Sequence, residues 1–124
     1  MSSRAPEDRR RAWRRGRLAE LVALWFLRCK GYRILARDLR LEVGEIDILA
    51  RRGRVLAAVE VKRREERAAA AEAVLDRQRR RIARALAAYA ARHPALAELD
   101  WRFDVVLLAR GRLPLHIPDA WRPD

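Results

Sequence analysis

Apolar residues recur at helical spacing in the segment before Gly31. The apolar positions lie three or four residues apart and are Leu18, Leu21, Val22, Trp25 and Phe26. This spacing predicts an amphipathic helix from Gly16 or Arg17 to Lys30, with Gly31 as its C-terminal cap. Residues 1–16 lack such periodicity and are rich in arginine, so we expect a flexible basic arm there, with a helical segment near Trp13 as the alternative.

Strand patterns follow between residues 32 and 63. Residues 32–41 alternate imperfectly between apolar and polar positions, whereas residues 45–51 and 55–63 alternate cleanly. The Arg52-Gly53-Arg54 turn between the two clean runs predicts a β-hairpin. If Gly53 is the first central residue of a type II′ turn, the numbers of paired residues sum to about 107.

This register predicts one apolar and one charged face on the hairpin. On the apolar face Ile46 would lie opposite Val61 and Ile48 opposite Val59. On the other face Asp47 would lie opposite Glu60, and Glu45 opposite Lys62. The pattern therefore brings two carboxylates and a lysine together on one strand pair.

A second helix and a further strand complete the pattern. An alanine-rich segment over residues 69–92 has an apolar stripe and ends at His93-Pro94, and residues 101–108 predict a strand. Glycine and proline in residues 111–124 indicate a short strand or an irregular tail. The order is helix, three strands, helix, strand, which is a mixed α/β fold. We expect an arm (1–16), one domain (17–110) and a C-terminal tail (111–124).

Composition narrows the class of protein. The 124 residues suffice for one domain, and the formal net charge is +12, with arginine at all cationic positions except Lys30 and Lys62. Arginine pairs with phosphate through a planar fork, so nucleic acid is the expected partner, although an ordinary arginine-rich surface gives the same count. The single cysteine, Cys29, excludes a disulfide framework. The longest nearly apolar run, residues 18–27, is too short to span a membrane, and we expect a cytoplasmic protein without membrane association.

The facing carboxylates are the main chemical signal. Two such groups directly opposite each other repel, and a divalent cation between Asp47 and Glu60 would remove the repulsion. Oxygen ligands together with water and a substrate phosphate suit Mg²⁺ or Mn²⁺. The alternative is a solvated sheet face with a Glu45–Lys62 ion pair.

Three further polar residues stand on otherwise apolar patterns. Glu20 borders the apolar stripe of the first helix, where a carboxylate needs a partner, although a first-turn glutamate is also favoured by the helix dipole. Gln78 lies on the apolar face of the second helix and either reaches into a site or borders the core. Asp104 is a carboxylate in the otherwise apolar run 103–108, and exposure to solvent is the simple explanation for it.

These residues stand in the order found in a known family. The motifs are Gly16-x-x-Ala19-Glu20, Gly31-Tyr32, Gly44-Glu45-Ile46-Asp47, Val59-Glu60-Val61-Lys62 and Phe103-Asp104-Val105-Val106. Over about residues 16–110 the chain resembles the YraN family of small bacterial proteins. That family looks like a minimal member of the PD-(D/E)xK nuclease superfamily, similar in arrangement to archaeal Holliday-junction resolvases.

The resemblance implies a restriction-endonuclease-like core, a mixed central sheet flanked by helices. It also implies roles: Asp47 and Glu60 as ligands of Mg²⁺ or Mn²⁺, Glu20 as a direct or water-mediated ligand, and Lys62 as the lysine of the catalytic motif. Many relatives have lysine where this chain has Gln78, which leaves that position as an accessory candidate together with Glu45.

The expected activity is hydrolysis of DNA, with structured or branched DNA as a candidate substrate. Backbone phosphates would be bound by arginines of the arm and of the two helices, namely Arg14, Arg15, Arg17, Arg77, Arg80, Arg81 and Arg84. The alternatives are a nucleic-acid-binding protein without catalysis and an adaptor, both on the same fold. A homodimer or a DNA-processing protein as a further partner is compatible with the sequence.

Overall fold

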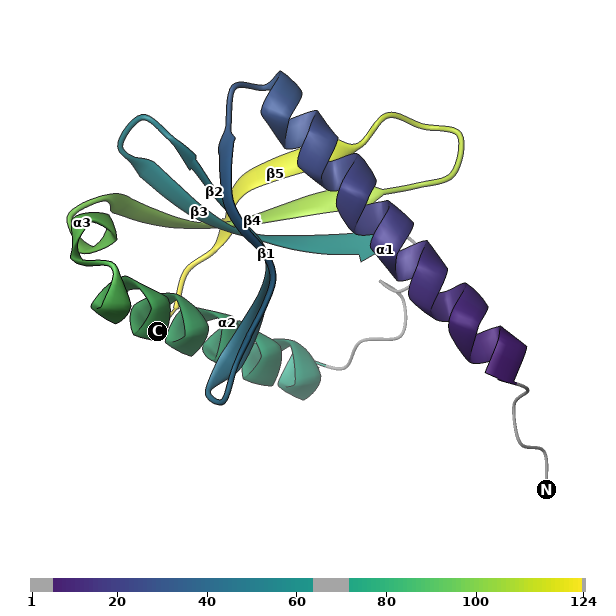
Figure 1. Cartoon of the computed structure of the whole chain (residues 1–124), viewed down its shortest axis with the longest axis horizontal. Coiled ribbons are helices and arrows are strands. Elements are labelled where there is room, and N and C mark those ends of the chain that lie inside the picture. Colours follow the sequence, from purple (N-terminus) through teal and green to yellow (C-terminus); the bar gives the residue numbers. More distant parts are fainter. Residues whose placement is uncertain (1–5, 64–71, 124) are drawn as a thin grey trace.

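Five strands form one mixed sheet in a computed structural model that describes residues 6–63 and 72–123 (Figure 1). The elements follow in the order α1 (Pro6–Cys29), β1 (Arg33–Leu41), β2 (Gly44–Arg52), β3 (Val55–Arg63), α2 (Glu72–Arg92), α3 (Pro94–Ala97), β4 (Asp100–Leu108) and β5 (Leu115–Trp121). The mixed α/β order expected from the sequence is confirmed, and it is consistent with a restriction-endonuclease-like fold. No helix within the described residues is long and apolar enough to cross a membrane.

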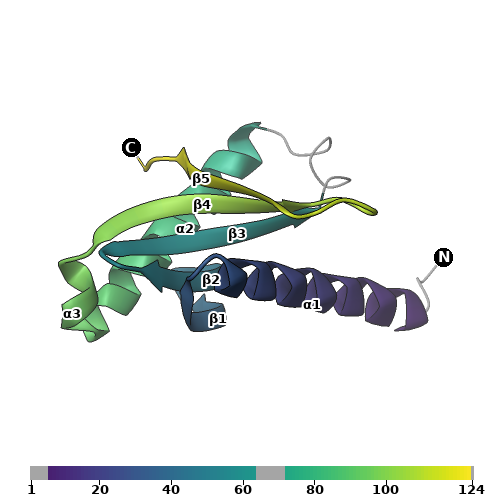
Figure 2. The ribbon, with the colours of Figure 1, turned by 90° about the horizontal axis from the view of Figure 1, so that it is seen from above.

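The strands lie in sequence order across the sheet, from β1 at one edge to β5 at the other. Neighbouring strands are antiparallel except β3 and β4, which are parallel because α2 and α3 lie in the connection between them. Figure 2 shows the sheet from above, with α1 and α2 on different sides of the twisted strands.

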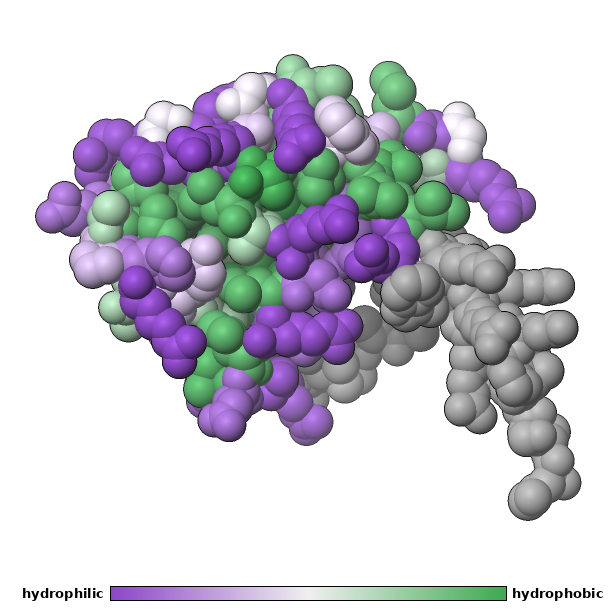
Figure 3. All heavy atoms as spheres, in the orientation of Figure 1, coloured by the Kyte–Doolittle hydropathy of each residue, from purple (hydrophilic) through white to green (hydrophobic). Residues whose placement is uncertain are grey.

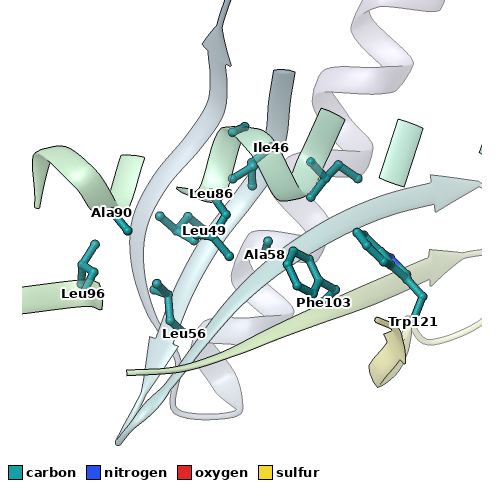
Figure 4. Packing of buried hydrophobic residues seen from close by; sticks show 11 residues of the cluster. Ile46, Leu49, Leu56, Ala58, Leu86, Ala90, Leu96, Phe103 and Trp121 are labelled. Atoms are coloured by element: carbon teal, nitrogen blue, oxygen red, sulfur yellow. The ribbon is translucent and has the colours of Figure 1, made fainter. Parts of the chain in front are cut away.

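Each face of the sheet carries its own hydrophobic cluster. The cluster below α2 contains Leu56, Ala58 and Leu86, and Figure 4 shows these side chains together with the rings of Phe103 and Trp121. The cluster below α1 contains Leu27 and Val59. Alternate residues of β3 belong to the two clusters, as the sequence pattern predicted. By the same alternation Glu60 and Lys62 lie on the side of the sheet that α2 covers.

The predicted register of the β2–β3 hairpin is confirmed next to its turn, where the pairs run from Arg52–Val55 to Ile48–Val59. The strand pairing ends there, so the predicted pairs beyond it, Ile46–Val61, Asp47–Glu60 and Glu45–Lys62, do not form. Gly53 has a φ of 60°, the left-handed value that the first central residue of a type II′ turn requires. The turn chemistry therefore sets the alignment of the two strands that carry the carboxylates.

The predicted common face of Ile46 and Ile48 is wrong. Ile46 packs in the cluster below α2, and Ile48 packs in the cluster below α1. The β1–β2 hairpin approaches α2 so closely that a Cβ on Gly44 would lie 1.8 Å from the Arg81 carbonyl oxygen. This close packing draws the first residues of β2 to α2, and simple alternation fails between Ile46 and Ile48.

The ends of the chain also differ from expectation. Helix α1 begins at Pro6, so residues 6–16, expected as part of an arm, are helical, while residues 1–5 lie outside the described part. A proline in the first position of a helix loses no hydrogen bond. The segment 111–124, expected outside the domain as a short strand or an irregular tail, contains β5, which confirms the short strand and adds it to the sheet of the domain. The second helix ends at Arg92 as predicted, and residues 69–71 of its expected start lie outside the described part.

Candidate active site

The candidate site lies where β3 continues beyond its last pair with β2. Glu60 is 7% exposed, and its neighbour along the same face, Lys62, has its Nζ 3.9 Å from Glu60 Oε2. Both side chains line a cavity of about 290 Å³ between the sheet and α2. The Glu60-Val61-Lys62 motif thus places a buried carboxylate and an amine side by side at a cavity wall.

Asp47 joins the site from β2 by a different route than the sequence suggested. The backbone pairs between β2 and β3 end at Ile48–Val59, and beyond this point the Val61 N–H donates a hydrogen bond of 2.9 Å to Asp47 Oδ2. The aspartate side chain thus replaces a backbone acceptor where the two strands separate. Its partner, Val61, is the residue between Glu60 and Lys62, so the bond holds Asp47 against this part of β3.

The environment of Glu60 disfavours its charge. Burial raises the pKa of Glu60, and the Asp47 carboxylate raises it further. Lys62, Arg79 and a hydrogen bond with Gln78 lower the pKa of Glu60, but the net direction remains upward. Within the described residues, Glu60 Oε2 has no hydrogen-bond donor.

Glu20 lies on α1, within electrostatic reach of Asp47. Partial burial raises its pKa, and Asp47 and Asp38 raise it further, while Arg17 lowers it. Asp47 therefore acts electrostatically on both glutamates. Across residues 6–63 and 72–123, however, no three acidic, histidine or cysteine side chains are close enough together to hold a metal ion.

The donor set around Glu60 fits a divalent cation. A buried carboxylate oxygen without a donor, next to a second carboxylate, offers the hard oxygen ligands that Mg²⁺ and Mn²⁺ prefer. These two carboxylates would supply only part of a coordination shell, and water and substrate oxygens would supply the remainder. The same cation would relieve the electrostatic cost that raises the pKa of Glu60.

The two accessory candidates occupy different surroundings. Gln78, on exposed α2 surface, reaches Glu60 by its side-chain hydrogen bond, as the sequence left open. Glu45 is half exposed and lies 3.9 Å from Arg81, so the alternative Glu45–Lys62 ion pair is replaced by Glu45–Arg81 and Glu60–Lys62 pairs. Gln78 therefore belongs to the site, and Glu45 lies at the α2 surface beside it.

The arginines expected to bind phosphate lie mainly on the outer surface of α2. Arg77, Arg80 and Arg84 are exposed, and Arg81 is half-buried beside Glu45. Arg17 lies near Glu20 and lowers its pKa. Arg14 and Arg15 belong to α1, but their side chains lie outside the described part. These arginines thus form a cationic outer face of α2, whereas Arg79 of the same helix lines the cavity with Glu60 and Lys62.

Asp104 forms a buried polar cluster that sequence reasoning missed. It is fully buried rather than exposed to solvent. Arg102 donates two hydrogen bonds to it, from Nε to Oδ1 at 2.8 Å and from a terminal nitrogen to Oδ2 at 2.7 Å. His116 Nε2 lies 2.8 Å from Oδ2, and the Asp119 N–H donates to Oδ1 at 2.9 Å. The carboxylate therefore ties β4 to β5.

The cluster extends to the end of α1. Lys30 Nζ lies 2.6 Å from His116 Nδ1, and because an ammonium can only donate, the His116 proton belongs on Nε2, facing Asp104. Arg102 also donates to the Tyr32 hydroxyl at 2.6 Å. A signal in the sequence was available: an acidic residue in an apolar strand, with an arginine two positions before it and a histidine in the following segment, indicates a buried ion pair.

Fold and site together define a class of protein: an α/β protein with a mixed five-stranded sheet that holds an Asp…Glu-x-Lys group at the separation of two strands. Residues 19–108 match the profile described as "Uncharacterised protein family UPF0102", and the chain belongs to this family. The resemblance to the YraN family is thereby confirmed, because the two names denote one family.

Several bacterial proteins are similar to this chain over most of their length. A UPF0102 protein of Parvibaculum lavamentivorans is 56% identical over 90% of this chain and 84% of its own. One from Paramagnetospirillum magneticum is 54% identical over 91% of both chains, and one from Caulobacter vibrioides is 49% identical over 86% of this chain and 85% of its own. The names of these relatives carry no activity.

Proposed function

We propose that this protein is a metal-dependent nuclease that hydrolyses DNA phosphodiester bonds. One observation carries the proposal: the buried Glu60 carboxylate has an oxygen without a donor among the described residues, next to Asp47 and to the Lys62 ammonium. A purely structural sheet face gains no stability from burying such a group. A cation-assisted reaction at a phosphate would use both the negative charge of Glu60 and its carboxylate oxygen without a donor.

Asp47 and Glu60 would hold Mg²⁺ or Mn²⁺, and Glu20 would act on the same ion through water. Such an ion polarises the scissile phosphate and lowers the pKa of a bound water. The Val61 N–H keeps one Asp47 oxygen oriented toward β3. Lys62 would donate hydrogen bonds to the attacking water and to a phosphate oxygen, which stabilises the negative charge that develops there.

Binding would come from the cationic surface of α2. Arg77, Arg80 and Arg84 are exposed on the helix that packs over the catalytic strands. Arginine contacts to backbone phosphates position a nucleic acid without selecting its sequence. This arrangement supports DNA, including structured or branched DNA, as the substrate.

The proposal is tested by metal binding and cleavage in the same preparation. Calorimetry should show that Asp47→Asn and Glu60→Gln each weaken Mn²⁺ binding, and linear, single-stranded and four-way-junction DNA should be cleaved by the wild type alone. Because the pKa of Glu60 is raised, its ionised form costs stability at neutral pH, so Glu60→Gln should stabilise the metal-free fold. Equal Mn²⁺ affinity in all three proteins would contradict the proposed site.

Lys62→Arg separates chemistry from binding in the same assay. The variant keeps the charge, but the bulkier guanidinium cannot approach a water and a phosphate oxygen as the compact ammonium does. Cleavage should fall by about two orders of magnitude, the effect of removing one transition-state donor. Lys30→Arg changes the only other lysine of the chain, which contacts His116 rather than Glu60, and should cleave at the wild-type rate. Equal rates for both variants would remove Lys62 from the reaction.

An adaptor function is the second candidate, and the surface of α1 favours it. In Figure 3 hydrophobic side chains form a band across the viewed face between hydrophilic margins. Leu18 and Val22 are exposed on α1 and line a groove of about 680 Å³, with Arg110 and Arg112 on its rim. Apolar walls with a cationic rim fit an acidic peptide with apolar side chains, from a DNA-processing protein. An adaptor would neither bind Mn²⁺ at Glu60 nor cleave DNA in the experiment above.

A further inference from the structure

Trp121, which lines the cavity beside Glu60, also has a polar atom without a partner in the described part of the chain. Trp121 is 7% exposed, and within the described residues its indole Nε1 has no hydrogen-bond acceptor. Glu60 and Trp121 both line the same cavity of about 290 Å³. An indole N–H buried without a partner is costly, so its placement at a cavity calls for a ligand acceptor.

The cavity walls indicate the shape and polarity of that ligand. Apolar side chains of β4 and β5, including Val105, Leu107 and Ile117, form part of the lining, and Lys62 and Arg79 supply positive charge. The volume is at the lower end of the range for small-molecule sites, roughly 300–1,000 Å³. A flat ring with polar atoms at its edge and a phosphate attached matches these features.

Trp121 is not free to stack on such a ring. Its indole already stacks on Phe103, with ring centroids 4.4 Å apart, and Figure 4 shows the two rings side by side. The Arg79 guanidinium lies 5.6 Å from the indole centroid. The N–H edge is therefore the part of Trp121 left for a ligand, and it is reached when the flexible Arg79 side chain turns toward a phosphate.

We propose that this cavity holds the base of an unpaired nucleotide, with the Trp121 N–H donating a hydrogen bond to an acceptor at the base edge. The inference rests on the proposed function, because it assigns the substrate class of the same site. A base inside a duplex is stacked and paired and cannot enter, whereas a base in a single strand, flap or junction can. The cavity thus selects DNA with an unpaired nucleotide next to the bond that faces Glu60 and Lys62.

Binding without metal tests the inference, so that cleavage is not needed. In EDTA the wild type should bind a thymidylate decamer more tightly than a decamer of abasic nucleotides, which carries the same backbone charge. Trp121→Phe keeps the ring on Phe103 but removes the donor, and it should reduce this preference about five-fold while leaving the affinity for the abasic decamer unchanged. Trp25→Phe changes an exposed indole on α1 and should keep the wild-type preference.

A second variant blocks the cavity from its exposed rim. Ala120 is exposed on β5 and lines the cavity, so Ala120→Leu adds volume there with little effect on the fold, and it should also reduce the preference for thymidylate. The inference is overturned if the wild type shows no preference, or if Trp121→Phe and Ala120→Leu both keep it. A wild type that prefers the thymidylate decamer but cleaves no DNA would contradict the proposed nuclease and support the base site. A wild type that cleaves DNA, with the preference unchanged in both variants, would contradict the base site alone.

Discussion

Replacing Asp104 by asparagine tests whether the buried polar cluster stabilises the fold. The change keeps the volume of the side chain but removes its charge and one of its two acceptor oxygens. Arg102, His116 and the Asp119 N–H together direct four hydrogen bonds at the carboxylate. An amide oxygen cannot accept all four, and the half-buried Arg102 guanidinium would lose its counterion.

The expected magnitude follows from the pKa of Asp104. Burial alone would raise that pKa, but the hydrogen bonds from His116, Arg102 and the Asp119 N–H lower it to about 2. Against the ordinary aspartate value of about 3.9, the difference corresponds to about 2.5 kcal/mol of stability in the ionised state. Because the pKa is depressed in the folded state, this stability is present above about pH 4 and is lost as the pH falls toward 2.

Urea unfolding followed by circular dichroism measures the effect. At pH 7 the variant should lose about 3 kcal/mol of unfolding free energy, since a partly buried charge is left unpaired as well. The gap between variant and wild type should narrow as the pH falls from about 4 toward 2. Asp100→Asn changes a carboxylate that is 74% exposed and should alter the free energy by less than about 0.5 kcal/mol. An Asp104→Asn protein as stable as the wild type at pH 7, or a gap independent of pH, would refute the reasoning.

Two further predictions concern packing and binding. Gly44→Ala places a methyl group against the Arg81 carbonyl, so the backbone must shift and the melting temperature should fall. Gly16→Ala adds a methyl group in open space on α1 and should raise the free energy of unfolding by about 0.5–1 kcal/mol. Thermal unfolding of both variants measures the two effects. In the double variant Arg80→Gln/Arg84→Gln, the slope of log affinity for DNA against log salt concentration should flatten by about 0.7–0.9 per lost phosphate contact. In the control double variant Arg110→Gln/Arg112→Gln the slope should stay at the wild-type value. Equal slopes for the two double variants would exclude α2 as the phosphate-binding surface.

Local sequence signals predicted the parts of the fold that local physics controls. The Gly53 turn alone fixed the register of β2 and β3, because a positive φ at that position admits few turn types. The helix ends at Cys29 and Arg92 were equally accessible, through Gly31 and Pro94. The separate faces of Ile46 and Ile48 were not, because they depend on how α2 packs against Gly44, a contact between distant segments.

The candidate site likewise combines features that local sequence predicts with features that depend on the packing of distant segments. Asp47, Glu60 and Lys62 lie on a hairpin, so the spacing of the motifs and the register of the turn are enough to predict that they meet. The hydrogen bond from Val61 to Asp47 forms because β2 and β3 separate beyond the Ile48–Val59 pair. The alternation of apolar and polar residues does not predict that separation. The hydrogen bond between Gln78 and Glu60 depends on the packing of α2 over β3, and the role of Trp121 depends on a strand that the sequence left as a short strand or an irregular tail.

The buried cluster and the cavity are connected through β5. Asp119 has a φ of 51°, a left-handed conformation that aspartate tolerates better than most residues, and its N–H is bound to Asp104. The pairing of β4 and β5 shifts register between Phe103 and Val105, at Asp104 itself. The bond therefore holds a bend in β5, and Trp121 follows that bend directly. Val105 and Leu107 form part of the cavity lining, while the neighbouring Asp104 holds β5 from the α1 side of β4. A carboxylate that takes no part in the proposed chemistry thus helps to position Trp121, whose Nε1 is the buried side-chain nitrogen without a partner among the described residues.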